Sequence, residues 1–112
     1  MSDYGLLLLV RKRNEKLTEN EISEIKTITK RLLEQNDLSN IFGQPFHCEI
    51  VHVSPKELAI KLSEYWGGED DEVEKTFESA EELDLESGQI LVHHLQSTLP
   101  ENTEVQLKFT EW

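Results

Sequence analysis

The feature that most constrains the fold of this chain is a run of four leucines and one valine at residues 6–10. A strand that is apolar on both faces is typical of the centre of a sheet. The run is far shorter than the roughly 20 apolar residues that a membrane-spanning helix needs. We therefore expect residues 4–11 to form a central strand of a globular domain.

The next segment carries the signals of a helix start. Thr18 and Glu21 have the spacing of a capping box, in which each side chain accepts a hydrogen bond from the backbone N–H of the other residue. Leu17 and Ile22 flank this box at the positions of a hydrophobic staple. Apolar residues then recur at intervals of three and four, which predicts a helix over residues 19–35.

Several further elements follow from local composition. Residues 36–44 are predicted to form a loop, and residues 46–53, rich in β-branched and aromatic side chains, a second strand. The spacing of apolar residues predicts two separate helices at residues 71–83 and 87–99. Residues 104–112 alternate between apolar and polar side chains, which is typical of a strand with one solvated face.

Residues 54–66 fit two different structures. In the helical interpretation Ser54 is the N-cap, a proline takes the first position and Gly67 ends the helix. In the strand interpretation apolar residues alternate from Leu58 onward, after a Ser-Pro-Lys turn. The helical interpretation accounts for both ends of the segment, and we favour it. The strand interpretation would give a split β-α-β, ferredoxin-like layout.

Together these elements predict an α+β fold. We expect one small domain over residues 1–112, with a three- or four-stranded sheet and helices mainly on one face. A chain of this length buries a core without disulfides, and its single cysteine, Cys48, has no partner in the chain. With no apolar leader pattern, we expect a cytoplasmic protein.

The charge of the chain is strongly negative and unevenly distributed. Against 11 Lys and Arg stand 23 Asp and Glu, a formal net charge of -12. Residues 67–112 contain thirteen acidic and two basic residues, so they contribute -11 of this charge. Nucleic acids and anionic membranes attract cationic surfaces, which argues against both as partners. A basic protein is the partner that this charge favours.

The acidic residues concentrate in residues 69–86, where Lys75 is the single cation. Such a segment serves either as a solvated surface or as a docking surface for a basic protein. A sequence that serves only solubility would be expected to intersperse lysines, so we favour docking. The predicted partner-binding residues are these acids and the two aromatic residues that precede them: Glu69, Asp70, Asp71, Glu72, Glu74, Glu78, Glu81, Glu82, Tyr65 and Trp66.

No motif in the sequence names a reaction, a metal or a cofactor. Strand alternation separates His47 from Cys48 and His52, so these residues do not converge on a zinc ion. Glu49 adjoins Cys48, whereas a reactive thiol needs cationic neighbours. Asp70 and the acids after it lack the spacing of a calcium loop. We therefore expect a non-enzymatic protein without catalytic residues, bound metal or cofactor.

In size, acidity and lack of a catalytic motif, the chain resembles bacterial immunity proteins and nuclease inhibitors. This resemblance implies a mechanism in which carboxylates occlude the cationic site of a toxin, often a nuclease. The alternative is a structural or regulatory module that forms a homodimer through its apolar first strand or an exposed sheet face. In that case the acidic segment only keeps the protein in solution.

Overall fold

Strand β1 (Asp3–Lys12) is the central strand of an antiparallel sheet in the computed structural model, which describes residues 3–39, 44–66 and 71–111. It pairs on one side with β3 (Leu58–Lys61) and β4 (Tyr65–Trp66), and on the other with β5 (Thr103–Glu111). Leu6, Leu8 and Val10 are completely buried. The apolar run therefore forms the predicted central strand.

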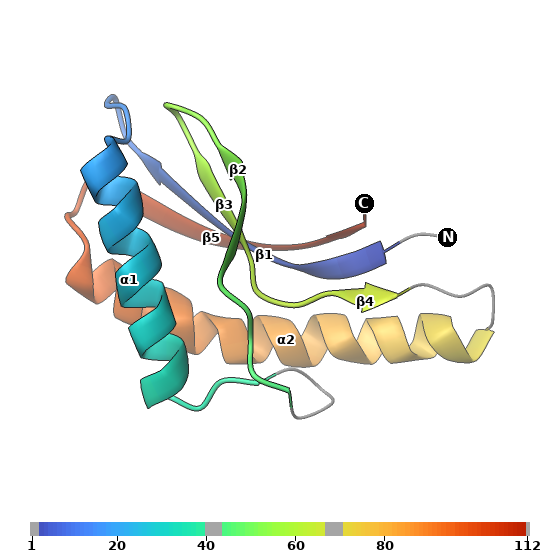
Figure 1. Cartoon of the computed structure of the whole chain (residues 1–112). Helices are drawn as coiled ribbons and strands as arrows, with labels where there is room; N and C mark the ends of the chain where they lie inside the picture. The colour runs from blue at the N-terminus through green and yellow to red at the C-terminus, as the bar shows by residue number, and fades with distance from the viewer. Residues whose placement is uncertain (1–2, 40–43, 67–70, 112) are drawn as a thin grey trace.

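The connections make two split β-α-β units (Figure 1). Helix α1 (Glu19–Gln35) joins β1 to β2 (Glu49–Val53), and these two strands are parallel because each is antiparallel to β3 between them. Helix α2 (Asp71–Thr98) joins β4 to β5, which lie on opposite sides of β1. The sheet order β2-β3-β1-β5 with these crossovers is the ferredoxin-like layout.

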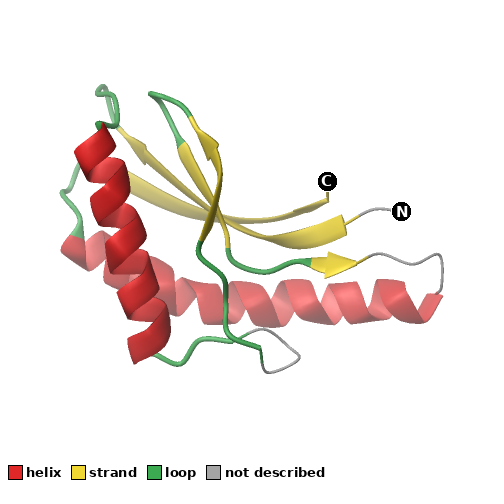
Figure 2. Ribbon diagram, in the orientation of Figure 1, coloured by secondary structure: helices red, strands yellow, loops and turns green. Residues whose placement is uncertain are grey.

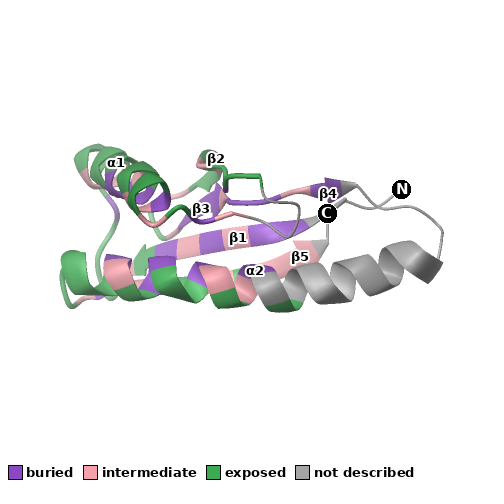
Figure 3. Cartoon of the chain, turned by 90° about the horizontal axis from the view of Figure 1, so that it is seen from below, coloured by how far each residue is buried: buried purple, intermediate pink, exposed green. Residues whose placement is uncertain are grey.

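Both helices cover the same face of the sheet (Figure 2). Figure 3, seen from below, shows α1 towards β2 and α2 towards β5. Ile25 and Ile28 of α1 and Leu91 and Leu95 of α2 join the buried β1 side chains in one hydrophobic core. This arrangement confirms the predicted α+β class with helices on one face.

The local signals at the start of α1 act as predicted. Thr18 Oγ1 accepts the Glu21 N–H, and a Glu21 carboxylate oxygen accepts the Thr18 N–H, both at 3.2 Å. Leu17 is buried and Ile22 packs against the core, which is the arrangement of a hydrophobic staple. The observed helix has the predicted bounds.

The preferred helix at residues 54–66 is wrong, and the strand interpretation is correct. Ser54 Oγ does accept the N–H groups of Lys56 and Glu57, as a helix cap would, but these bonds close the turn between β2 and β3. The Ser54 N–H also donates to the Glu57 carbonyl. Hydrogen bonds from backbone N–H groups to the Ser54 hydroxyl are compatible with a helix cap and with a tight turn. The pairing of residues 58–61 with β1 shows that the segment forms a turn and a strand.

A β-bulge separates β3 from β4. Lys61 pairs with Leu7 and Tyr65 with Tyr4, so three residues of this segment lie opposite two of β1. The Leu62 N–H donates to the Leu6 carbonyl, but the Leu6 N–H donates to the side-chain oxygen of Ser63. The bulge therefore directs Ser63 into the buried side of the sheet, where it is 1% exposed.

The two helices predicted at residues 71–83 and 87–99 form one continuous helix, α2. It packs tightly on the sheet at Gly88, where an added methyl group would lie 2.7 Å from Cδ1 of Leu107 and 3.2 Å from Cδ2 of Leu6. A glycine in mid-helix normally costs stability. Here the missing side chain lets α2 pack directly on β1 and β5.

Replacement of this glycine tests the close approach. Gly88→Ala should lower the free energy of unfolding by about 1 kcal/mol, because overpacking of about 1–3 kcal/mol exceeds the gain of about 1 kcal/mol in helix propensity. Urea unfolding followed by circular dichroism measures the change. Gln89→Ala, at an exposed position of the same turn, is the control and should not destabilise. A stabilised Gly88→Ala variant would contradict the tight packing.

Candidate functional site

The acids predicted to bind a partner lie mainly on α2. Glu69 and Asp70 are outside the described residues. The backbone of the next five acids belongs to the first three turns of α2, whereas their side chains are outside the described part of the chain; they are Asp71, Glu72, Glu74, Glu78 and Glu81. Glu82 is exposed on the same helix. The structure thus places these six acids on one regular element.

The two aromatic residues of the predicted site lie on strand β4. The side chain of Trp66 is outside the described residues. Tyr65 is 5% exposed, and its ring lies 6.3 Å from that of Phe109 in the core. In this structure the Tyr65 ring therefore contributes to packing between β4 and β5, and does not offer an apolar surface to a partner.

A buried polar cluster joins the bulge to α2, and its acceptor is a single carboxylate oxygen. The Ser63 hydroxyl donates to Asp84 Oδ2 at 2.7 Å, and the Tyr65 hydroxyl donates to the same oxygen at 2.6 Å. Because Ser63 also accepts the Leu6 N–H at 3.2 Å, the bonds run from β1 through the bulge to the helix. We call Ser63, Tyr65 and Asp84 the polar clasp.

The environment of Asp84 disfavours its charged form. The residue is 1% exposed, and its other oxygen, Oδ1, has no hydrogen-bond partner among the described residues. Burial raises the pKa of the Asp84 carboxyl, and the hydrogen bonds from Tyr65 and Ser63 only partly oppose this effect. The carboxylate is therefore directed into the protein and is not part of an acidic surface.

Sequence reasoning counted Asp84 among the acids of residues 69–86 and did not predict the polar clasp. A signal was present in its spacing. Positions 77, 80, 84, 88, 91 and 95 are separated by three or four residues, so Asp84 falls on the apolar face of the helix. A buried carboxylate at such a position needs hydrogen-bond donors, which Ser63 and Tyr65 provide.

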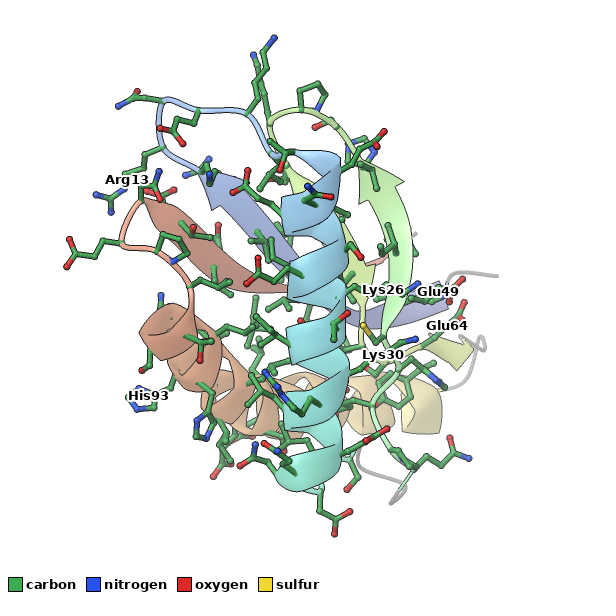
Figure 4. The ribbon with its side chains drawn as sticks, turned by 60° about the vertical axis from the view of Figure 1, so that its left-hand side comes forward. Arg13, Lys26, Lys30, Glu49, Glu64 and His93 are labelled. Atoms are coloured by element: carbon green, nitrogen blue, oxygen red, sulfur yellow. The ribbon has the colours of Figure 1, made fainter. Side chains whose placement is uncertain are left out.

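The end of β1 carries three consecutive basic residues, Arg11, Lys12 and Arg13, and all three form ion pairs within the chain. Arg11 and Arg13 bind the two carboxylate oxygens of Glu104 at 2.6 and 2.7 Å, and they hold the pKa of that carboxyl below its usual range. Lys12 pairs with Glu15 and Glu21. Figure 4 shows Arg13 at this end of the sheet. The cluster is therefore largely neutralised before any ligand approaches.

A second group of charges lies on the open face of the sheet. Lys61 pairs with Glu64 at 3.0 Å and with Glu49 at 3.2 Å, which raises the pKa of its ammonium group. The two carboxylates of this group are therefore partly neutralised by Lys61.

The described histidines and the cysteine do not assemble a reactive centre. The Cys48 thiol is half-buried and donates to the Lys26 carbonyl at 3.8 Å. Burial raises the pKa of this thiol, against the weaker effect of Lys30 and Lys26, which keeps it protonated near neutral pH. Within the described residues, no three His, Cys, Asp or Glu side chains are grouped to hold a metal ion.

Comparisons of the chain with protein families, with curated proteins and with solved structures found no match. Across residues 3–39, 44–66 and 71–111, no helix has both the length and the apolar character to cross a membrane.

Removal of the shared acceptor tests the polar clasp. Asp84→Ala leaves two buried hydroxyl groups without an acceptor and should lower the free energy of unfolding by about 2–4 kcal/mol. Asp84→Asn retains an acceptor oxygen and should stay within about 1 kcal/mol of the parent. Chemical unfolding of the two variants measures the difference. Equal losses in both would show that the hydrogen bonds to Asp84 do not matter.

The pH dependence of stability tests the ionisation of Asp84. Its folded pKa is raised above the value of about 3.9 in an unfolded chain, so its favourable contribution is full below about pH 4 and is lost as pH rises through the folded pKa. Unfolding of the parent and of Asp84→Asn between about pH 4 and pH 8 measures this contribution. The stability of the parent relative to the variant should fall with rising pH. A relative stability that rises would contradict the raised pKa.

Proposed function

We propose that the protein is a non-enzymatic binding module of the immunity or inhibitor type, which recognises a basic protein through the acidic half of α2. The observation that supports this proposal best is the continuity of α2 over Asp71–Thr98. Six acids and one lysine occupy its first twelve residues. A continuous helix presents charges at fixed intervals, which favours recognition of a complementary surface.

The ion pairs elsewhere in the molecule support the same proposal. Among the described side chains, Arg11, Lys12, Arg13 and Lys61 pair with acids outside α2. Glu82 and Glu86 are the acids of the segment whose exposed side chains are described, and no described cation pairs with either. The negative charge of the described exposed acids on this helix is therefore not offset by a described cation, and clustered like charges destabilise a folded protein. A basic partner supplies the missing cations.

The mechanism is occlusion. Nucleases bind a polyanion, so their substrate site is cationic, and an acidic helix is complementary to that site. Clustered carboxylates accelerate the encounter and pair with Arg and Lys, which excludes the nucleic acid without any chemical step. A toxin nuclease is the partner that fits this mechanism. The proposed site consists of the α2 acids, and Tyr65 contributes by holding the helix through the polar clasp.

The test is affinity isolation from the native host at low salt, followed by identification of the captured protein and measurement of its nuclease activity. The triple variant Glu72→Gln, Glu74→Gln and Glu78→Gln should bind the captured protein at least about tenfold more weakly. Binding by the parent should weaken steeply with added salt. The parent should also inhibit the activity, and the triple variant should inhibit it less.

A matched variant separates local from overall charge. Glu24→Gln, Glu34→Gln and Glu101→Gln remove the same charge from exposed positions outside the acidic segment of α2. Retained binding in this control and weakened binding in the α2 variant would support the proposal. Equal binding by all three proteins would place the interface elsewhere.

A further inference from the structure

Strand β5 forms an edge of the sheet along its whole length. All nine residues of Thr103–Glu111 have partners on β1, and the register is constant throughout. Within the described residues, no strand pairs with the other side of β5. An edge strand directs alternate backbone N–H and C=O groups away from the sheet, where a further strand can pair with them.

The opposite edge of the sheet has the features that block such pairing. Strand β2 has only five residues, and its register shifts between Ile50 and His52. A bulge and short length are means by which proteins protect an edge. Strand β5 has neither of these two features, although it is the longer edge.

The charges around β5 favour the approach of a second acidic protein. Glu104 is neutralised by Arg11 and Arg13. Lys108 is exposed at the middle of the strand. On β5 itself the charge of Glu104 is therefore offset, and Lys108 adds a positive charge. Repulsion between acids of two copies that lie more than about 8 Å apart is largely screened at physiological ionic strength.

The sequence of β5 is complementary to itself in one register. Antiparallel pairing about Leu107 places Gln106 of each copy opposite Lys108 of the other, and Val105 opposite Phe109. A shift that centres the pairing on Lys108 would place the two lysines directly opposite one another. Like charges in that position are destabilising, so Lys108 selects the register.

We propose that β5 pairs with β5 of a second copy of this chain, about a two-fold axis at Leu107. The axis is perpendicular to the sheet, so the two sheets join into one and both pairs of helices lie on the same face. This interface does not depend on the proposed recognition of a basic protein, because it uses the strand edge and not α2.

Sedimentation velocity over a range of protein concentrations tests the proposal. The parent should be a dimer that dissociates on dilution. Gln106→Lys places a lysine opposite Lys108 at both symmetric positions, so the dissociation constant should rise by about tenfold. Addition of Lys108→Glu to this variant makes both facing pairs opposite in charge and should restore the dimer. These positions are exposed, and circular dichroism verifies that each variant folds.

Two substitutions with the same charge changes, Gln35→Lys and Lys16→Glu, lie at exposed positions away from β5 and serve as controls that should not alter the dimer. A parent that remains monomeric up to about 1 mM, the scale of very weak association, would overturn the proposal. A dimer that Gln106→Lys does not weaken, or that the double variant does not restore, would also overturn it.

Discussion

The pairing of β1 along both of its edges is the interaction on which the rest of the molecule depends. Strands β3, β4 and β5 each pair with β1, and β2 joins the sheet through β3. Leu6 is the point where these contacts converge. Its backbone bonds to two of the three residues of the bulge, Leu62 and Ser63, and its side chain lies beneath Gly88 of α2. A displacement there would disturb the bulge, the polar clasp and the helix contact together.

Local signals predicted the elements whose structure is decided locally. The capping box fixed the start of α1 because its hydrogen bonds join residues three apart, and the apolar run identified β1 because both faces were apolar. The segment after Ser54 could not be assigned this way. Ser54 makes the bonds expected of a helix cap, but long-range pairing with β1 turns the segment into strands.

The continuity of α2 was missed for a related reason. The prediction of two helices rested on the spacing of apolar residues, and Asp84 and Gly88, which lie on the same stripe, are not apolar. In the structure both positions face the sheet, and each is compensated by a specific partner. The Ser63 and Tyr65 hydroxyls satisfy the aspartate, and Leu107 occupies the space that the glycine leaves open. Such compensation involves residues far apart in sequence, so a periodic pattern alone does not reveal it.

The acidic surface of α2 contains one acid fewer than the sequence of residues 69–86 suggests, because Asp84 is buried.

The two proposed interfaces differ in their electrostatics. Recognition of a basic protein is an attraction that salt screens, whereas pairing of two copies with a charge of -12 each works against a repulsion that salt also screens. Rising ionic strength therefore weakens the first association and favours the second, because screening acts on opposite signs of the same long-range force.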